Sequence, residues 1–258
     1  MEKEFVYHFT KYENFLSILK SRRLFLSDIK LTNDPSEGIY PRRVIEKYAK
    51  ELFKNDFEYI RPFFIVGTIE NQLIEMHSLS FSFDLENIHN WMEYGEYGKG
   101  VAIRFNYKKL IETIKRFGGL GVDNVMYSEE DVLKRLHDIR NSHSDKPGYE
   151  KAILLLRLYP FVKHQSYALE SEMRVALIES VKQTSVETDD LLFYFNTDNK
   201  YVFNVDKLIA ENIIDAVIVG SDMSIYSYDS LNQYIEENKL GLKVIHSKTP
   251  IRRKKDEK

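Results

Sequence analysis

The chain of 258 residues contains no cysteine. Disulfide bridges and thiolate metal sites are therefore excluded, and we expect the protein to work in the reducing cytoplasm. No apolar run approaches the roughly 18 residues of a membrane-spanning helix. The N-terminal stretch MEKEFVYHFT also lacks an apolar segment, so we expect no signal peptide and no membrane partner. The net charge of −3 provides no overall basic field that would attract nucleic acid.

Several catalytic signatures are also missing. The glycine-rich stretch FGGLG at 117–121 lacks the lysine of a phosphate-binding loop, and no Rossmann glycine pattern is present. The seven histidines show no HExxH arrangement, so the sequence gives no reason to expect a metal site. The serines of SLSFSF lack the strand–turn–helix glycine context of a hydrolase nucleophile.

What the sequence does contain is an alternation of strand and helix patterns, without an internal repeat or a linker. Strands are predicted over 4–10, 23–28, 77–83, 100–105, 122–127, 167–178, 191–195, 200–205, 213–220 and 242–247. Helices are predicted over 11–21, 35–55, 87–98, 106–117, 129–162 and 225–237, with a loop at 142–148. This order predicts one α+β domain over 1–248, with a mixed or antiparallel sheet and inserted helices, and a charged flexible tail over 249–258.

Two predicted helices have recognisable starts. Thr10 matches the first position of a capping box before the helix at 11–21. In LTNDPSEG, Asp34 is the expected N-cap, Pro35 the first helical residue and Glu37 the third. Asn33 and Asp34 could instead form a polar lip over a ligand, but the helix start accounts for more of the stretch.

The stretch YALESEMRVALI at 167–178 places charges inside an apolar, β-prone segment. In an extended chain Glu170, Glu172 and Arg174 share one face, because side chains of a strand alternate between its two faces. Such a face is either a solvated edge, where the ion pairs contribute little, or the wall of a site. Paired carboxylates can stabilise a developing positive charge or remove a proton from an acceptor.

Two other strands carry polar side chains on one face. In VYHFT, period two places His8 and Thr10 together, and His8 either donates a hydrogen bond to a ligand hydroxyl or is a half-buried structural histidine. Ser80 and Ser82 of SLSFSF share a face as well, and they either hold a ligand or point to solvent.

Taken in order, several stretches resemble a family of bacterial proteins of unknown function. These stretches are YHFT, LFLS, NDPSE, SFS, WMEYGEYGKGVAIRF, VMY and a lysine seven residues before ESEMR. The family typically shows N-D-P, an S-x-S strand, a W-x-x-Y segment leading into G-x-x-I-x-F, a V-x-Y strand, and a lysine followed by E-x-E-x-R. The resemblance runs from about residue 5 to residue 220.

The front part of the chain also looks similar to ADP-ribosyltransferase folds, which often begin with a histidine-bearing strand and carry a late catalytic glutamate. This resemblance implies that His8 binds the ribose of NAD and takes part in catalysis. It implies that Ser80 and Ser82 support the NAD-binding strand. Glu172 would be the catalytic glutamate, and Glu170 would orient the acceptor.

Further side chains are assigned to the same NAD site. Thr10 and Arg174 are expected to line it, and the ring of Tyr94 to pack against nicotinamide. The resemblance does not single out a catalytic tyrosine, so Tyr94, Tyr97 and Tyr127 all remain candidates.

The function expected from the resemblance is an NAD-dependent ADP-ribosyltransferase, such as a bacterial toxin or antiphage effector that modifies a protein or a nucleic acid. Two alternatives stay open. One is a non-catalytic nucleotide-binding or sensing module that uses the same cleft. The other is a nucleic-acid-processing defence protein, which only the basic stretch RRKK and the pair at 22–23 favour.

Overall fold

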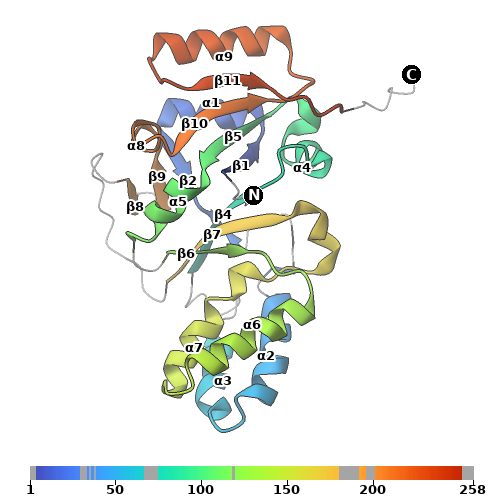
Figure 1. The fold of residues 1–258 in the computed structure, drawn as a ribbon, viewed down its shortest axis with the longest axis vertical. Coiled ribbons are helices and arrows are strands. Elements are labelled where there is room, and N and C mark those ends of the chain that lie inside the picture. Colours follow the sequence, from blue (N-terminus) through green and yellow to red (C-terminus); the bar gives the residue numbers. More distant parts are fainter. Residues whose placement is uncertain are drawn as a thin grey trace.

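The fold is known from a computed structural model, which describes residues 4–29, 34, 36–37, 39–66, 75–117, 120–179, 192–195 and 201–251. The chain forms an α+β domain around one mixed, mostly antiparallel sheet, as the sequence predicts. Helices cover this sheet and a helical bundle extends from one end of it (Figure 1). Within the described residues no helix is long and apolar enough to cross a membrane.

The main sheet has the strand order β11-β10-β5-β1-β4-β7-β6, and the short β3 also pairs with β4. Its parallel pair is β10 with β11, and the other recorded pairs are antiparallel. The strands are β1 (Phe5–Thr10), β3 (Ser27–Asp28), β4 (Glu75–Ser82), β5 (Val101–Asn106), β6 (Leu120–Asn124), β7 (Glu172–Glu179), β10 (Ile214–Val219) and β11 (Lys243–His246). A second, three-stranded sheet consists of β2 (Arg23–Phe25), β9 (Tyr201–Asn204) and β8 (Phe193–Phe195).

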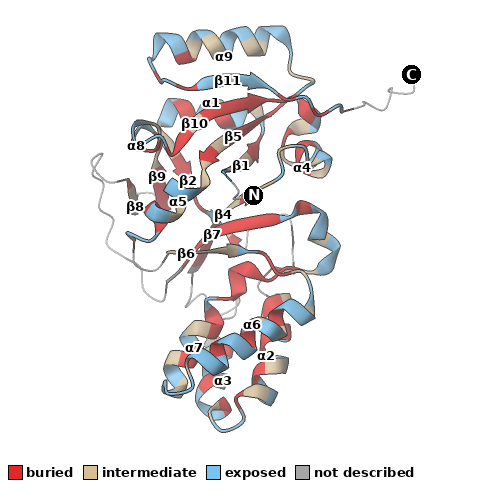
Figure 2. Cartoon of the chain, in the orientation of Figure 1, coloured by how far each residue is buried: buried red, intermediate tan, exposed pale blue. Residues whose placement is uncertain are grey.

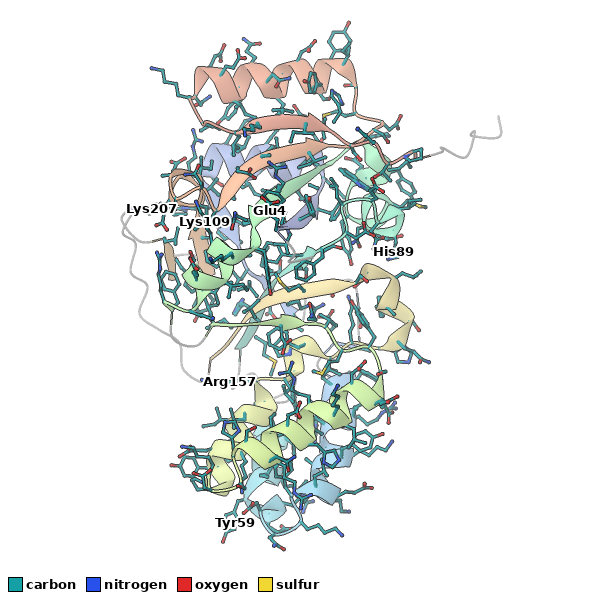
Figure 3. The ribbon with its side chains drawn as sticks, viewed as in Figure 1. Glu4, Tyr59, His89, Lys109, Arg157 and Lys207 are labelled. Carbon is teal, nitrogen blue, oxygen red and sulfur yellow. The ribbon has the colours of Figure 1, made fainter. Side chains whose placement is uncertain are left out.

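The helices gather in two regions. One set lies beside the upper strands of Figure 1 and comprises α1 (Tyr12–Ser21), α4 (Ile88–Glu93), α5 (Tyr107–Ile114), α8 (Val205–Ala210) and α9 (Ile225–Glu237). The other is the bundle of α2 (Ile39–Leu52), α3 (Phe57–Val66), α6 (Glu129–Ser142) and α7 (Gly148–Leu156). The buried residues of Figure 2 run through the sheet and into the interior of this bundle. Tyr59 lies at the end of the bundle away from the sheet (Figure 3).

The two faces of β4 and β7 have different partners. Leu79, Phe81 and Val175 belong to the large apolar core that α1, α5 and β5 share. On the opposite face, Met76 and Ala176 pack into the core of the helical bundle. Further along this second face the side chains become polar, and that polar end is where the site lies.

The main sheet is nearly interrupted between β1 and β4. Over their described lengths these strands pair at one recorded position, Tyr7 opposite Ser82. In contrast, β1 pairs with β5 at six positions and β4 pairs with β7 at eight. Since paired backbones lie only about 5 Å apart, the loss of pairing past Tyr7 opens a gap in the sheet.

The predicted helix starts are wrong in both cases. Thr10 is the last residue of β1, and the N-cap of α1 is Lys11, without a side-chain cap. Helix α2 begins at Ile39, so Glu37 lies before the helix in a turn. Asp34 stabilises that turn, because its Oδ1 accepts hydrogen bonds from the backbone N and the Oγ of Ser36 at 2.8 and 2.6 Å. Pro35 and Asn33 lie outside the described residues.

Other boundaries differ as well. The predicted strand 23–28 is split between two sheets, since β2 pairs with β9 while β3 pairs with β4. The predicted strand 122–127 is shifted to 120–124, and α3 was not foreseen. At the C-terminal end, Thr249 is buried and Ile251 packs against the cluster around Phe9 and Trp91. Residues 252–258 lie outside the described part.

The prediction of one strand over 167–178 is also wrong. Residues Gln165–Glu170 form the 3₁₀ helix η5, and β7 begins only at Glu172. Between them, Ser171 adopts the left-handed conformation with φ 48° and ψ 51°. The chain passes from helix to strand at this turn. Glu170 and Glu172 therefore lie on either side of the turn and are not alternate residues of one strand.

Substitutions at Ser171 test this conformation. A left-handed backbone costs a non-glycine residue about 1–2 kcal/mol, and β-branched residues tolerate it least. Ser171→Gly is therefore expected to raise the free energy of unfolding by roughly 0.5–1 kcal/mol. Ser171→Val is expected to lower it by about 1–2 kcal/mol. Urea denaturation measures both, and equal stability of the two variants would contradict the left-handed turn.

Candidate functional site

A cavity of about 240 Å³ lies at the opening between β1 and β4. Consecutive residues of both strands line it, as expected for a hollow at a strand edge. The predicted site residues that line it are His8, Ser80, Ser82, Tyr94, Glu170, Glu172 and Arg174. The structure thus brings together seven of the eight side chains that the sequence analysis assigned to the NAD site. Thr10 does not line the cavity; it is buried opposite Val101.

Strand register explains why four of these side chains meet. In the β4–β7 ladder, Ser80 lies opposite Arg174 and Ser82 lies opposite Glu172. Directly opposed residues of antiparallel strands point to the same face. The two serines and the two charged residues therefore share one face.

His8 connects the two strands across the opening. Its Nδ1 lies 2.8 Å from the backbone carbonyl oxygen of Ser80. Because a carbonyl only accepts, Nδ1 carries the proton of this hydrogen bond. Burial lowers the pKa of His8, while the bond to Ser80 opposes this effect. In the resulting neutral ring Nε2 is an acceptor, so His8 can receive a hydrogen bond from a ligand hydroxyl rather than donate one, which corrects the prediction.

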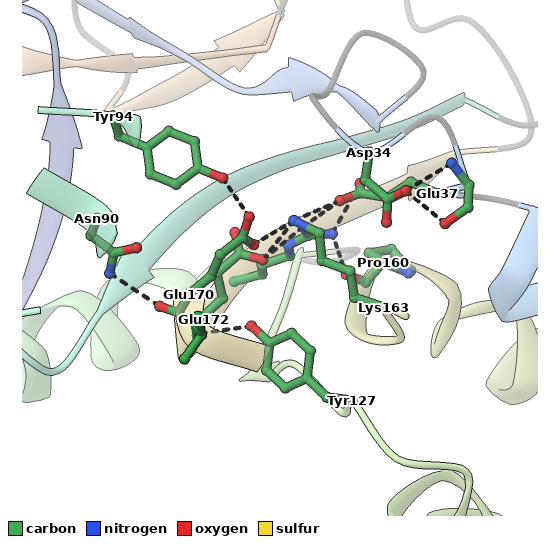
Figure 4. Close-up of polar contacts among 12 residues, drawn as sticks. Asp34, Glu37, Asn90, Tyr94, Tyr127, Pro160, Lys163, Glu170 and Glu172 are labelled. Atoms are coloured by element: carbon green, nitrogen blue, oxygen red, sulfur yellow. Dashed lines mark hydrogen bonds and ion pairs between the residues drawn. The ribbon is translucent and has the colours of Figure 1, made fainter. Parts of the chain in front are cut away.

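One wall of the cavity belongs to a buried cluster of five charged side chains, drawn in Figure 4. Its acids are Glu37, Glu170 and Glu172, and its cations are Lys163 and Arg174. All five have side chains that are at most 7% exposed. Charges so well removed from water are maintained only when paired and hydrogen-bonded.

Arg174 is the most heavily engaged member of this cluster. Its two terminal nitrogens bond to both oxygens of Glu37, at 3.2 and 2.7 Å. They also donate to Glu172 Oε2 at 2.9 Å and to the carbonyl oxygen of Pro160 at 2.9 Å. These bonds hold the carboxylate of Glu172 in place, and the guanidinium acts here as a positioning group.

Lys163 reaches the same acids from the other side. Its Nζ lies 2.5 Å from Glu170 Oε2, 3.3 Å from Glu37 Oε1 and 3.6 Å from Glu172 Oε2. Burial alone would lower the pKa of Lys163, but the surrounding carboxylates raise it. The lysine therefore remains charged at neutral pH.

The pKa values of the two glutamates of ESE are shifted in opposite directions. Burial, followed by the charge of Glu172, raises the pKa of Glu170. Burial would also raise the pKa of Glu172, but Arg174 and Lys163, with hydrogen bonds from Ser80 and Arg174, hold it below its usual range. Glu172 is thus an ionised carboxylate at neutral pH, whereas Glu170 is the more readily protonated acid. Such separation of two carboxyl groups is typical of acid–base sites.

This difference predicts a pH dependence of stability. Since the pKa of Glu170 is raised in the folded state, the native protein binds its proton more tightly than the unfolded chain does. The stabilisation from Glu170 is therefore complete below the unfolded pKa of 4.5 and is lost as pH rises through the raised folded pKa. Glutamine does not titrate, so the stability of Glu170→Gln should not show this decrease with rising pH.

Chemical denaturation of both proteins between pH 4 and pH 8 measures the effect, over a range of about four units around the carboxyl pKa. The stability difference, variant minus wild type, should increase with pH. A difference that stays constant across the range would show that Glu170 titrates normally.

The candidate tyrosines occupy different places. Tyr94 lines the cavity and donates from its hydroxyl to Glu170 Oε1 at 2.7 Å. Tyr127 does not line it; its hydroxyl accepts a hydrogen bond from the backbone N of Glu172 at 3.0 Å. Tyr97 is 56% exposed and belongs to a left-handed turn. Tyr94 is therefore the one of the three in a position to touch a ligand in this cavity.

Asn90 supports the same wall from α4. Its side chain donates to the backbone carbonyl of Glu170 at 3.1 Å, and the neighbouring Asn87 donates to that of Leu169 at 2.8 Å. These two bonds tie α4 to the end of η5, and thereby fix Tyr94 relative to Glu170.

Sequence reasoning missed the roles of Glu37 and Lys163. Glu37 had been interpreted as part of a helix start, although it pairs with Arg174 across 137 positions of the chain. Lys163 had been noted only for its spacing before ESEMR. Glu37 belongs to the NDPSE motif, and Lys163 is the lysine that precedes ESEMR in the resemblance. Their place among the motifs of the family was therefore the sequence signal that could have identified both residues.

The cluster is not arranged as a metal centre. Its carboxylates are bound by Lys163 and Arg174. Among the described residues, no group of three or more His, Cys, Asp or Glu side chains is placed to hold a metal ion.

Comparison with known proteins gives one match. Residues 90–175, about a third of the chain, match a family described as "Protein of unknown function (DUF2971)". This part includes Tyr94, Lys163 and the ESEMR stretch, but not β1 or β4. No curated protein and no solved structure is significantly similar to the chain.

Proposed function

We propose that this protein is an NAD-dependent ADP-ribosyltransferase that binds the nicotinamide end of NAD in the cavity between β1 and β4. The observation that carries the proposal is the meeting of His8, the two serines of β4 and the two glutamates of ESE at one opening of the sheet. These residues come from three strands and the end of a helix, and were selected by their resemblance to ADP-ribosyltransferase sites. The opening between β1 and β4 offers a binding place between two strands of the sheet.

The ionised Glu172 suits the first step of this reaction. When the bond between nicotinamide and ribose breaks, its electron pair leaves with the ring, and positive charge develops on the ribose. A fixed carboxylate beside that carbon stabilises the charge. Arg174 and Lys163 position the carboxylate, and His8 Nε2 accepts a hydrogen bond from a ribose hydroxyl.

Glu170 suits the second step. A nucleophilic atom of the acceptor forms the new bond to the ribose carbon and must lose a proton. With its raised pKa, Glu170 is a better proton acceptor than an ordinary glutamate. Its hydrogen bonds with Tyr94 and Lys163 hold it at the cavity wall.

The size of the cavity limits what it encloses. Pockets for drug-sized ligands span roughly 300–1,000 Å³, whereas this cavity measures about 240 Å³. In the proposed complex the cavity therefore encloses nicotinamide and its ribose, and the adenylate half of NAD lies outside it. The biological setting proposed is that of a cytoplasmic bacterial toxin or antiphage effector.

A second candidate is a nucleotide-binding or sensing module without turnover. It is favoured by the pairing of Glu172, whose carboxylate already accepts a hydrogen bond from Arg174 at 2.9 Å. A ligand that only binds raises the melting temperature by mass action and leaves NAD intact.

The experiment that separates the two candidates measures nicotinamide release from NAD by the purified protein, with and without bacterial lysate. Release that increases with protein concentration supports the transferase, and lysate then serves to find the acceptor. An NAD-dependent rise in melting temperature without release supports the binding module. If the folded protein shows no nicotinamide release and NAD does not change its melting temperature, both candidates are refuted.

A further inference from the structure

A second hollow, of about 480 Å³, lies outside the cavity just described. It is formed by the start of α2 and by the stretch from His164 to Tyr167, and we call it the α2 groove. Its side chains include Tyr40, Arg43, His164 and Tyr167. None of these four residues lines the first cavity.

The α2 groove is nevertheless connected to the charged cluster. Nζ of Lys163 lies 4.6 Å from the ring centre of Tyr167. Lys163 lines the first cavity, and Tyr167 lines the groove. One layer of side chains therefore separates a ligand in the groove from the glutamates of the site.

Aromatic rings and a cation lie together in this groove. The rings of Tyr40 and His164 meet edge to face, with their centres 5.1 Å apart. The guanidinium of Arg43 lies 5.8 Å from the ring centre of Tyr40. Among the described residues Arg43 has no ion-pair partner within 4 Å, although its charge helps to lower the pKa of Glu129, and its exposed side chain can still pair with an anion.

His164 adds a directed donor. Its Nδ1 accepts a hydrogen bond from the backbone N of Ser166 at 3.3 Å, which caps η5. A neutral imidazole that accepts at Nδ1 carries its proton on Nε2. His164 Nε2 is therefore a donor to a ligand oxygen.

The acidic side chain of the groove is only partly occupied, since Oδ2 of Asp34 has no hydrogen-bond partner within the described part of the chain. Asp34 lines the groove, and its Oδ1 receives two hydrogen bonds from Ser36. The groove thus combines the half-buried rings of Tyr40 and Tyr167 with the exposed side chain of Arg43 and an imidazole donor. This chemistry fits an aromatic base attached to a phosphate.

We propose that the α2 groove binds a nucleotide of a single-stranded nucleic acid, with the base against Tyr40 and Tyr167 and the phosphate at Arg43. A single strand is favoured because its bases can leave the stack and pack on aromatic side chains, which a duplex does not permit. The net charge of −3 is also unsuited to a broad duplex-binding face. This further inference rests on the proposed function: the bound single-stranded nucleic acid is the acceptor of ADP-ribose.

Binding is tested by fluorescence anisotropy of labelled eight-nucleotide DNA and RNA strands with the full chain, in the absence of NAD; eight is of the order of known single-strand site sizes. Loss of a base-stacking ring costs about 1–3 kcal/mol, or roughly 5- to 150-fold in Kd. Tyr40→Ala is therefore expected to weaken binding by about five-fold or more. Arg43→Ala should weaken it and reduce its salt dependence.

Tyr59→Ala is the matched control, because Tyr59 is 69% exposed at the far end of the bundle (Figure 3). It is expected to bind like wild type. Equal binding by Tyr40→Ala and Tyr59→Ala, or no binding of any strand, would overturn the proposal. So would tight binding of free AMP with no binding of the strands, which would assign the groove to a free nucleotide. Since NAD is absent, the result is independent of whether nicotinamide release is observed.

Discussion

Glu172→Gln is expected to reduce nicotinamide release from NAD by about 10²–10³-fold, the usual loss when one group that stabilises transition-state charge is removed. Glutamine keeps the shape of the side chain and an oxygen that accepts from Arg174. It lacks the negative charge that the proposal places beside the ribose carbon. The measurement is the rate of nicotinamide release at saturating NAD, which reports this charge directly.

The fold of this variant is expected to persist. Arg174 keeps both hydrogen bonds to Glu37, so the melting temperature should change by no more than roughly 5 °C. Glu93→Gln, at an exposed position of α4, is the matched control and should release nicotinamide at the wild-type rate. If Glu172→Gln were folded and as active as this control, Glu172 would not be the catalytic glutamate.

Arg174→Leu is expected to cause the largest loss of stability, about 3–5 kcal/mol in the free energy of unfolding. Glu37 and Glu172 are both buried, and each would lose its guanidinium partner. Lys163 lies 3.3 and 3.6 Å from these acids and compensates only in part. Urea denaturation gives the free energy, with far-UV circular dichroism as the probe.

Arg104→Leu is the comparison. Arg104 also forms a two-bond pair, with Asp215 at 2.8 and 2.6 Å, but its side chain is 17% exposed and that of Asp215 is 26% exposed. Pairs in contact with water are worth about 1 kcal/mol or less. Equal losses in the two variants would mean that burial does not set the energetics of the cluster.

Local sequence patterns predict several of the helices and strands of this fold well. The alternation in β1 and the helical spacing of α1, α5 and α9 are determined by neighbouring residues, and these elements lie within three residues of their expected bounds. The shared face of Ser80 and Ser82 follows from the same alternation, because β4 is regular over its length. The α+β class and the mostly antiparallel sheet follow from the order of these elements.

The conformation around ESE could not be predicted in this way. A left-handed residue is usually marked by glycine or asparagine, and at this turn the chain has Ser171. The extended pattern of YALESEMRVALI therefore suggested one continuous strand. The surrounding network, including the hydrogen bond of Asn90 to Glu170, holds the turn in place.

The partners of the glutamates are a second limit. Glu37 and Arg174 are 137 positions apart, and a single sequence contains no local signal for such a pair. The opening between β1 and β4 is likewise a property of the assembled sheet, because each strand alone has an ordinary pattern. The sequence could therefore suggest which residues line the cavity, but not that Glu37 and Lys163 pair with them.

The most direct test of the central claim is a crystal structure of Glu172→Gln with NAD, since a variant that does not cleave NAD retains it. We predict that nicotinamide and its ribose occupy the opening between β1 and β4, with a ribose hydroxyl bonded to Nε2 of His8 and the nicotinamide–ribose bond beside residue 172. NAD bound elsewhere on the protein, or crystals of the folded variant that take up no NAD at saturating concentration, would contradict the account.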